Sequence, residues 1–190
     1  MSDVQGIIMD AAERRFAGYG YSKTTMAEIA ADCDMSVGNL YRHFRNKEAI
    51  AMGNVRRLLQ NKLQTGERAA LGKDDACEAL EAFLLARLRL AHKHYAGTRH
   101  LFDMMVLVNT RHRDLLLEFE QQVIDALATI VERGVAQGRF HPCDVQQTAY
   151  DIHQATLRYN TPINLKNNPL PMLEEDLRRL VQLLYRGLAC

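Results

Sequence analysis

The stretch TTMAEIAADCDMSVGNLYRHFRNKE, residues 24–48, predicts two short helices separated by a tight turn. A capping box, Thr25-x-x-Glu28, begins the first helix, because each side chain can satisfy a free backbone N–H of the other residue. The pattern breaks at Asp34, and a second helix is expected from about residue 36 to residue 44. Asn46 can then cap a long helix that starts near residue 47.

Outside this stretch, apolar residues recur at helical spacing and no alternating strand pattern is present, so the sequence predicts an all-α protein. We expect a three-helix head (1–50) and a helical C-terminal domain (51–190), with a long linking helix at about 47–66. The polar stretch 65–75 is the candidate boundary. A capping box, Asp144-x-x-Gln147, begins one later helix, and a proline-rich connection covers residues 162–171. The remaining helices are expected at 4–19, 75–95, 98–109, 111–137, 144–160 and 171–188.

Composition and charge limit the partners and the cellular location that we expect for this protein. The chain has 24 lysines and arginines against 23 aspartates and glutamates, so its formal net charge is only +1 and an anionic partner must be met by a local patch. The four cysteines are far apart and form no C-x-x-C pair, as is typical of reduced intracellular proteins. We expect no signal peptide, because acids and arginines lie among the apolar positions of the N-terminal segment, and no membrane span, because no apolar segment is long enough. We therefore expect a cytoplasmic protein with no membrane partner.

The second short helix combines an apolar side with a basic side. In helical projection Val37, Leu40 and Phe44 fall together, whereas Gly38, Asn39, Arg42 and Arg45 fall on the opposite side. Two short helices joined by such a turn match the helix-turn-helix, whose second helix enters the major groove of DNA. Arg42 can donate two bonds to guanine, Asn39 can pair with adenine, and Tyr41, His43 and Lys47 can hold phosphate oxygens. The same residues also fit a plain solvated basic face, which this helix alone does not exclude.

A longer run of matching features extends from residue 8 to residue 50. It consists of Ala11, Ala12, Phe16, Gly20, Tyr21, Thr24, Thr25, Met26, Ile29, Ala30, Ser36, Gly38, Leu40, Tyr41, His43, Phe44, Lys47, Glu48 and Ile50. This run resembles the TetR/AcrR family of bacterial transcription regulators, whose pattern reads A..LF...GY..TTM..IA...GVS.G.LY.HF.NKE.L. The resemblance covers about the first quarter of the chain. Asp34 and Met35 stand where the family often has Gly and Val, and aspartate tolerates the positive φ that such a turn can require.

The resemblance implies an N-terminal helix-turn-helix head and a C-terminal helical domain for ligand binding and dimerisation. It implies a homodimeric repressor that leaves a palindromic double-stranded DNA operator when an unknown small-molecule effector binds, without cofactor or enzymatic activity. Repression and activation are both open at this point. The implied DNA-binding residues are Thr25 and Lys47 at phosphates, His43 at the backbone, Val37, Gly38, Asn39, Tyr41 and Arg42 at or near base edges, and Ser36 beside them.

The second half of the chain offers weaker signals. Polar or adaptable residues on apolar faces are candidates for an effector pocket, although core packing explains each of them too: His92, Met104, Met105, Tyr150, His153 and Tyr159. The last helix carries an apolar stripe, which Val181 and Tyr185 widen beyond what one core face needs: Leu173, Leu177, Leu180, Leu184 and Leu188. With the helix at 144–160 it can form a four-helix bundle with a second copy, or pack within its own chain.

Two other function classes stay open. A small all-α enzyme is one, although the sequence contains no H-E-x-x-H, no phosphate-binding glycine loop and no G-x-S-x-G. A helix-turn-helix module that binds protein is the other, and weak salt dependence would distinguish it from a DNA-binding protein. No metal site is expected, because His92 and His94 are two residues apart and point away from each other on a helix.

Overall fold

The computed structural model describes residues 3–95 and 101–189, except for the side chains of Asp3, residues 101–103 and Met105. Within these residues the chain is helical and has no strand, which confirms the predicted all-α class. It separates into two compact units, residues 1–59 with 98–116 and residues 60–97 with 117–190. The division at residue 50 stays a prediction. No described helix is long and apolar enough to cross a membrane.

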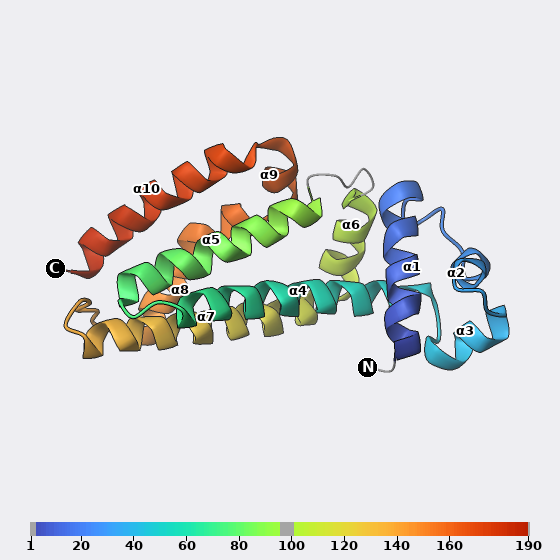
Figure 1. Cartoon of the computed structure of the whole chain (residues 1–190), viewed down its shortest axis with the longest axis horizontal. Coiled ribbons are helices and arrows are strands. Elements are labelled where there is room, and N and C mark those ends of the chain that lie inside the picture. The colour runs from blue at the N-terminus through green and yellow to red at the C-terminus, as the bar shows by residue number, and fades with distance from the viewer. Residues whose placement is uncertain (1–2, 96–100, 190) are drawn as a thin grey trace. The chain divides into compact units, whose positions relative to one another are not determined.

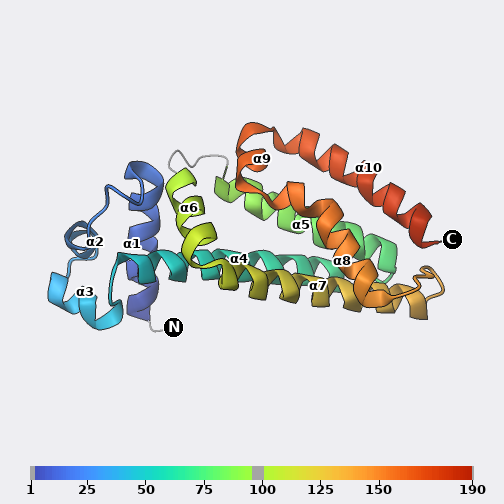
Figure 2. The same cartoon turned by 180° about the vertical axis from the view of Figure 1, so that it is seen from behind.

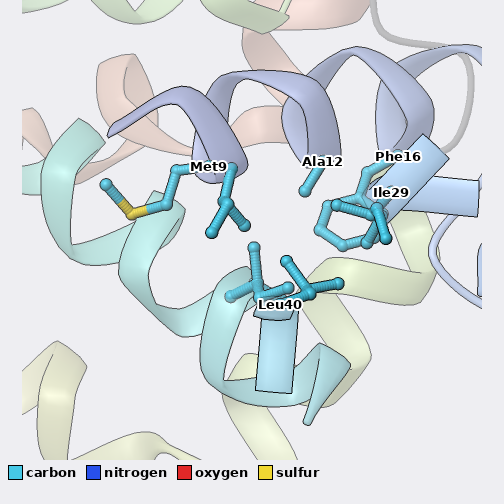
Figure 3. Close-up of a cluster of buried hydrophobic side chains, with 9 residues drawn as sticks. Met9, Ala12, Phe16, Ile29 and Leu40 are labelled. Atoms are coloured by element: carbon cyan, nitrogen blue, oxygen red, sulfur yellow. The ribbon is translucent and has the colours of Figure 1, made fainter. Parts of the chain in front are cut away.

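The first unit is built from α1 (Asp3–Tyr19), α2 (Met26–Asp32), α3 (Val37–His43), the start of α4 (Lys47–Leu71) and α6 (Leu101–Arg111) (Figure 1). One apolar core joins the first four of these helices, and Leu40 is the residue that α3 contributes to it. Figure 3 shows these side chains gathered between the ribbons. The core consists of Ile8, Met9, Ala12, Phe16, Ile29, Ala30, Leu40, Ile50 and Ala51.

The second unit contains the rest of α4, α5 (Ala76–Tyr95), most of α7 (Arg113–Ala136), α8 (Val145–Thr156), a 3-10 turn η1 (Leu157–Asn160), α9 (Pro162–Asn167) and α10 (Leu170–Leu188). Helix α10 lies alongside α5 in both views (Figure 1 and Figure 2). Leu173, Leu177 and Val181 are its buried residues, spaced four apart, whereas Leu180 and Leu184 of the predicted stripe are half-buried.

Helix α4 ends five residues later than the predicted end at residue 66, at Leu71. Gly66 explains why the chain stays helical there: a Cβ at this position would come within 2.9 Å of side-chain atoms of both Phe83 and Arg87. The glycine that we took as a sign of a linker therefore permits close packing of α4 on α5. Residues 65–71 are therefore helical and not a connecting loop.

Two further differences occur near the C-terminus. The predicted connection at residues 162–171 contains the short helix α9, because Pro162 occupies the first helical position, where its missing N–H is not needed. Asp144 caps α8 by accepting a hydrogen bond from the Gln147 backbone N–H (2.9 Å), as predicted. The Gln147 side chain, however, donates to Asp151 in the next turn, so only half of this capping box is present.

Candidate nucleic-acid interface

Helix α2 is held by its N-terminal cap and by α1. Thr25 Oγ1 accepts a hydrogen bond from the Glu28 backbone N–H (3.3 Å), and the Glu28 carboxylate accepts one from the Thr25 N–H (2.8 Å), which confirms the capping box. Arg15 of α1 donates two hydrogen bonds to Asp32 (2.6 and 2.8 Å) and lies 3.3 Å from Glu28. Hydrogen bonding with Arg15 keeps the pKa of Asp32 below its ordinary value. Arg15 thus offsets the charge of both acids of α2, while Thr25 itself stays exposed.

The turn between α2 and α3 has the geometry that the sequence suggested. Asp34 has a φ of 51°, in the left-handed region that aspartate tolerates better than most residues. Ser36 is the N-cap of α3 and accepts a hydrogen bond from the Asn39 backbone N–H (3.2 Å). Leu40 is completely buried and anchors α3 to the apolar core of the first unit. The turn, the cap and this one anchor therefore fix which side of α3 faces outward.

The outward side of α3 consists of Val37, Gly38, Tyr41 and Arg42, all exposed. The helical projection that grouped Val37 with Leu40 and Phe44 was wrong for Val37, which is 38% exposed. A helix of seven residues reaches the core through its middle, and Val37 lies in the first turn, away from the Leu40 anchor. Tyr41 is 52% exposed, so it is not a core residue.

Several features of this outward side suit close contact with a polyanion. The Arg42 side chain forms no hydrogen bond or ion pair with any described residue, so its donors are available to a partner. Nothing in the described protein lies within 4 Å of the position that a Gly38 Cβ would occupy, so internal packing does not require glycine there. Asn39 and His43, at the edges of this side, are half-buried. No acidic side chain belongs to α3.

Lys47 has a different position from the one expected of a free phosphate ligand. Its ammonium group donates hydrogen bonds to the backbone carbonyls of Tyr21 (2.7 Å) and Thr24 (2.7 Å) and lies 4.4 Å from the centre of the Tyr21 ring. Burial lowers its pKa from the ordinary lysine value. In this structure Lys47 holds the loop before α2 onto the start of α4, and its phosphate contact stays a prediction.

The segment that follows α6 is tied to the start of α4. Glu48 accepts hydrogen bonds from His112 Nε2 (2.7 Å) and from Arg111 Nη1 (3.3 Å). The His112 bond, assisted by the positive charge of Arg111, keeps the pKa of Glu48 below its ordinary value. Glu48 belongs to the first turn of α4, five residues after the end of α3. This contact therefore links the end of α6 to the start of α4, close in sequence to the candidate DNA-binding helix.

The candidate pocket residues differ in their burial and in the unit to which they belong. Met104 packs against the core of the first unit, and the Met105 side chain lies outside the described residues. Tyr150 is exposed on α8, and His92 is half-buried with its Nε2 3.1 Å from the Asn168 carbonyl oxygen. Only two of the six are fully buried in the second unit, namely His153 on α8 and Tyr159 in η1.

Sequence reasoning missed two buried cations in the second unit, Lys62 of α4 and Arg87 of α5, which are only 3% and 1% exposed. A signal for both is present in the sequence. Arg87 falls on the apolar stripe of α5, with apolar residues three and four positions away on either side, and Lys62 lies three residues after the buried Leu59. A lysine or arginine in such a position is rarely buried without a partner.

Known proteins match both parts of the chain. A sequence model of bacterial regulatory proteins of the tetR family matches residues 8–51, and one of tetracyclin repressor-like C-terminal domains matches residues 76–181. The HTH-type transcriptional regulator YhgD of Bacillus subtilis (strain 168), itself uncharacterized, is 24% identical over 148 residues, 78% of each chain. TtgR of Pseudomonas putida, also an HTH-type transcriptional regulator, is 28% identical over 145 residues, 69% of this chain and 67% of TtgR.

A solved structure shows the same fold. The transcriptional regulator of the TetR/AcrR family from Thermobifida fusca aligns over 98% of each chain with a TM-score of 0.73, at 18% sequence identity. The chain therefore shares the fold of this solved structure.

Proposed function

The chain belongs to the tetR family of bacterial regulatory proteins, and on this premise we propose that it is a repressor that binds a palindromic operator as a homodimer and is released by a small molecule. The single observation that carries the DNA-binding part is the outward side of α3, where Gly38, Tyr41 and Arg42 are exposed next to a cap and a turn of helix-turn-helix geometry. Placed in a major groove, this side brings Arg42 to base edges.

The contacts divide by role. Val37, Gly38, Asn39, Tyr41 and Arg42 are at or near base edges, while Thr25, Ser36, His43 and Lys47 serve the phosphate backbone. For Thr25 and Ser36 the cap role does not compete with a phosphate contact, because both side chains are exposed at helix N-termini, where backbone dipoles favour anions. Lys47 acts first by positioning the loop before α2, through its bonds to the Tyr21 and Thr24 carbonyls.

Dimerisation is the second part of the proposal. A palindromic site requires two heads, and an isologous twofold contact supplies them. Helices α8 and α10 each keep a large apolar side chain in solvent, Tyr150 (46% exposed) and Leu183 (64% exposed), beyond what packing within the chain covers. A bundle of α8 and α10 with the same helices of a second copy would cover both residues.

Release by a small molecule is the third part. A ligand shifts a two-state equilibrium only by its differential affinity for the two states, so it must bind better to the form that does not fit the operator. Helix α4 begins next to α3 and contributes to both units, and Glu48 near its start is bonded to His112 and Arg111. These features support α4 as the element through which the effector alters the heads.

The test replaces Arg42 and measures DNA binding by fluorescence anisotropy, using a duplex that the parent protein selects from genomic fragments. Arg42→Ala is expected to lose about 1–3 kcal/mol of discrimination per half-site between this duplex and a scrambled one. Arg139→Ala is the matched control, since Arg139 lies in the connection between α7 and α8 and its ion pair is to Asp75. If the parent selects no duplex, or binds DNA without sequence preference and without dependence on salt, a protein-binding module would be favoured instead.

A further inference from the structure

Three basic side chains from three helices are buried close together in the second unit. Lys62 of α4, Arg87 of α5 and His153 of α8 are 3%, 1% and 4% exposed. They are near enough to act on one another: burial and then the charge of Arg87 lower the pKa of Lys62 to about 7, and burial with both cations lowers the pKa of His153 to about 4. Burial alone lowers the pKa of Arg87 to about 10. All three environments thus disfavour the positive charge.

No carboxylate among the described residues forms an ion pair with these basic side chains. Neither Lys62 nor Arg87 forms a hydrogen bond or ion pair with a described group, and the Nε and Nη1 atoms of Arg87 and the Nε2 atom of His153 are buried without a hydrogen-bond partner. Thr156, three residues after His153, donates its hydroxyl proton to the backbone carbonyls of Ile152 and His153. That proton is therefore not available for a hydrogen bond to another group. Buried donors in native proteins are almost always paired, so three in one place require an explanation.

Packing does not supply that explanation. The stem of Arg87 lies against Gly66, and its guanidinium carbon is 5.2 Å from the centre of the Phe83 ring. A methionine would fill the same space without a buried charge, and exchanging buried ions for apolar residues of similar size often stabilises a protein. The cations are therefore best explained by something that binds between them.

We propose that Lys62, Arg87 and His153 form the recognition site for the anionic group of the effector, which we infer to be a small organic carboxylate. Arg87 presents a planar donor fork that matches a carboxylate in two parallel bonds, and Lys62 adds a point charge. His153 donates one further N–H, which it can do in its neutral form. The apolar side chains that flank these residues on their helices, such as Phe83, Leu84 and Ile152, suit an apolar body on the ligand. This inference rests on the proposed function, in which the second unit binds the effector.

A bound anion would also change the protonation of Lys62. In the free protein at pH 8 most Lys62 side chains are neutral, because the pKa is about 7. A carboxylate beside the amine favours the charged form, so binding at this pH must take up a proton, close to one per protomer. Arg87 stays charged and His153 neutral at pH 8, so neither contributes to this uptake.

The experiment uses the full chain and three pairs of probes: benzoate, hexanoate and phenylacetate, each against its neutral amide at equal ionic strength. Thermal unfolding is followed for the parent, Lys62→Met, Arg87→Met and Arg89→Met. The last is the matched control, because Arg89 is two residues further along α5, partly in solvent and paired with Glu174. We expect at least one carboxylate to raise the parent Tm by about 3 °C or more beyond its amide at concentrations well above Kd. This difference should persist in Arg89→Met and vanish in Arg87→Met.

Calorimetry of the active carboxylate in Tris and in HEPES at pH 8 then counts protons. The parent should take up close to one and Lys62→Met none. Carboxylates no better than amides, equal preference in Arg87→Met, or no proton uptake by the parent would each overturn the inference. If Arg87→Met is unfolded by circular dichroism, the proton count of the parent decides.

Operator binding by the same preparations separates this inference from the proposed function. An operator-binding protein without carboxylate preference would refute the anion site alone. A carboxylate-binding protein that retains no DNA would refute the regulator function alone.

Discussion

The substitution Lys62→Met should change how stability depends on pH, with a sign that the structure fixes. The pKa of Lys62 is about 7 in the folded chain because of burial and the neighbouring charge of Arg87, against about 10.4 in an unfolded chain. Between these values the unfolded state holds more protons than the folded state. The free energy of unfolding of the parent must therefore rise as pH rises above 7, and the substitution should remove this rise.

The magnitude follows from the two pKa values. From pH 7 to pH 8.5 the Lys62 contribution to the free energy of unfolding rises by about 1.5 kcal/mol. With a urea m-value of about 2–3 kcal/mol/M, the midpoint of the parent moves upward by about 0.5–0.8 M relative to Lys62→Met. Other groups whose protonation differs between the folded and unfolded states, including Cys33 and Cys77 with their raised pKa values, are present in both proteins and largely cancel from the comparison.

Urea unfolding followed by circular dichroism at 222 nm measures this difference, since the chain is helical and has no tryptophan. Lys73→Met is the control, because Lys73 is exposed and lies 3.5 Å from Glu78. At pH 7 Lys62→Met should be at least as stable as the parent, as no bond of the ammonium group is lost. Identical pH dependence of the parent and Lys62→Met, or a large loss of stability on substitution, would refute the reasoning about this buried cation.

Three substitutions test the head and the end of α7. Leu40→Ala should destabilise the first unit by about 2–5 kcal/mol, because it empties the only core position of α3; chemical denaturation measures the loss, and a loss below about 1 kcal/mol would contradict the anchor role. Lys47→Ala should cost about 1.5–3 kcal/mol of stability, because its hydrogen bonds to two backbone carbonyls are lost. It should also lower the affinity for all DNA sequences about equally in anisotropy measurements, and an unchanged Tm would refute the positioning role. Gly134→Ala places a Cβ in steric clash with one edge of the buried Phe140 ring and should cost about 1–3 kcal/mol; an unchanged Tm would contradict this.

Local capping chemistry made the head predictable from sequence. Thr25 with Glu28, Ser36 and Asn46 fix helix starts through bonds to residues three positions away, so no distant contact is needed to anticipate them. Asp34 adopts the positive φ that its place in the turn suggested. The orientation of α3 was less predictable, because projection on an ideal helix ignores how little of a seven-residue helix reaches the core, and Val37 was misplaced as a result.

The second unit depends on contacts between distant residues, which periodicity does not reveal. Gly66 indicates a linker in isolation, and only the side chains of α5 show that it is a packing glycine. Lys62 and Arg87 were passed over because long cationic side chains usually reach solvent from a helix stripe. Periodicity also does not reveal that Met104 packs against the core of the first unit, to which α6 belongs, and its place in an effector pocket stays a prediction.

The most direct measurement of the central claim is to mix the purified protein with sheared DNA of its source organism in moderate salt and to sequence what is retained. We expect enrichment of a short inverted repeat whose half-sites lie about 10 base pairs, or a multiple of that spacing, apart. The Arg42→Ala protein in the same experiment should lose this enrichment. Retention of all fragments alike, or of none, by the parent protein would contradict the claim that the chain is a sequence-specific regulator.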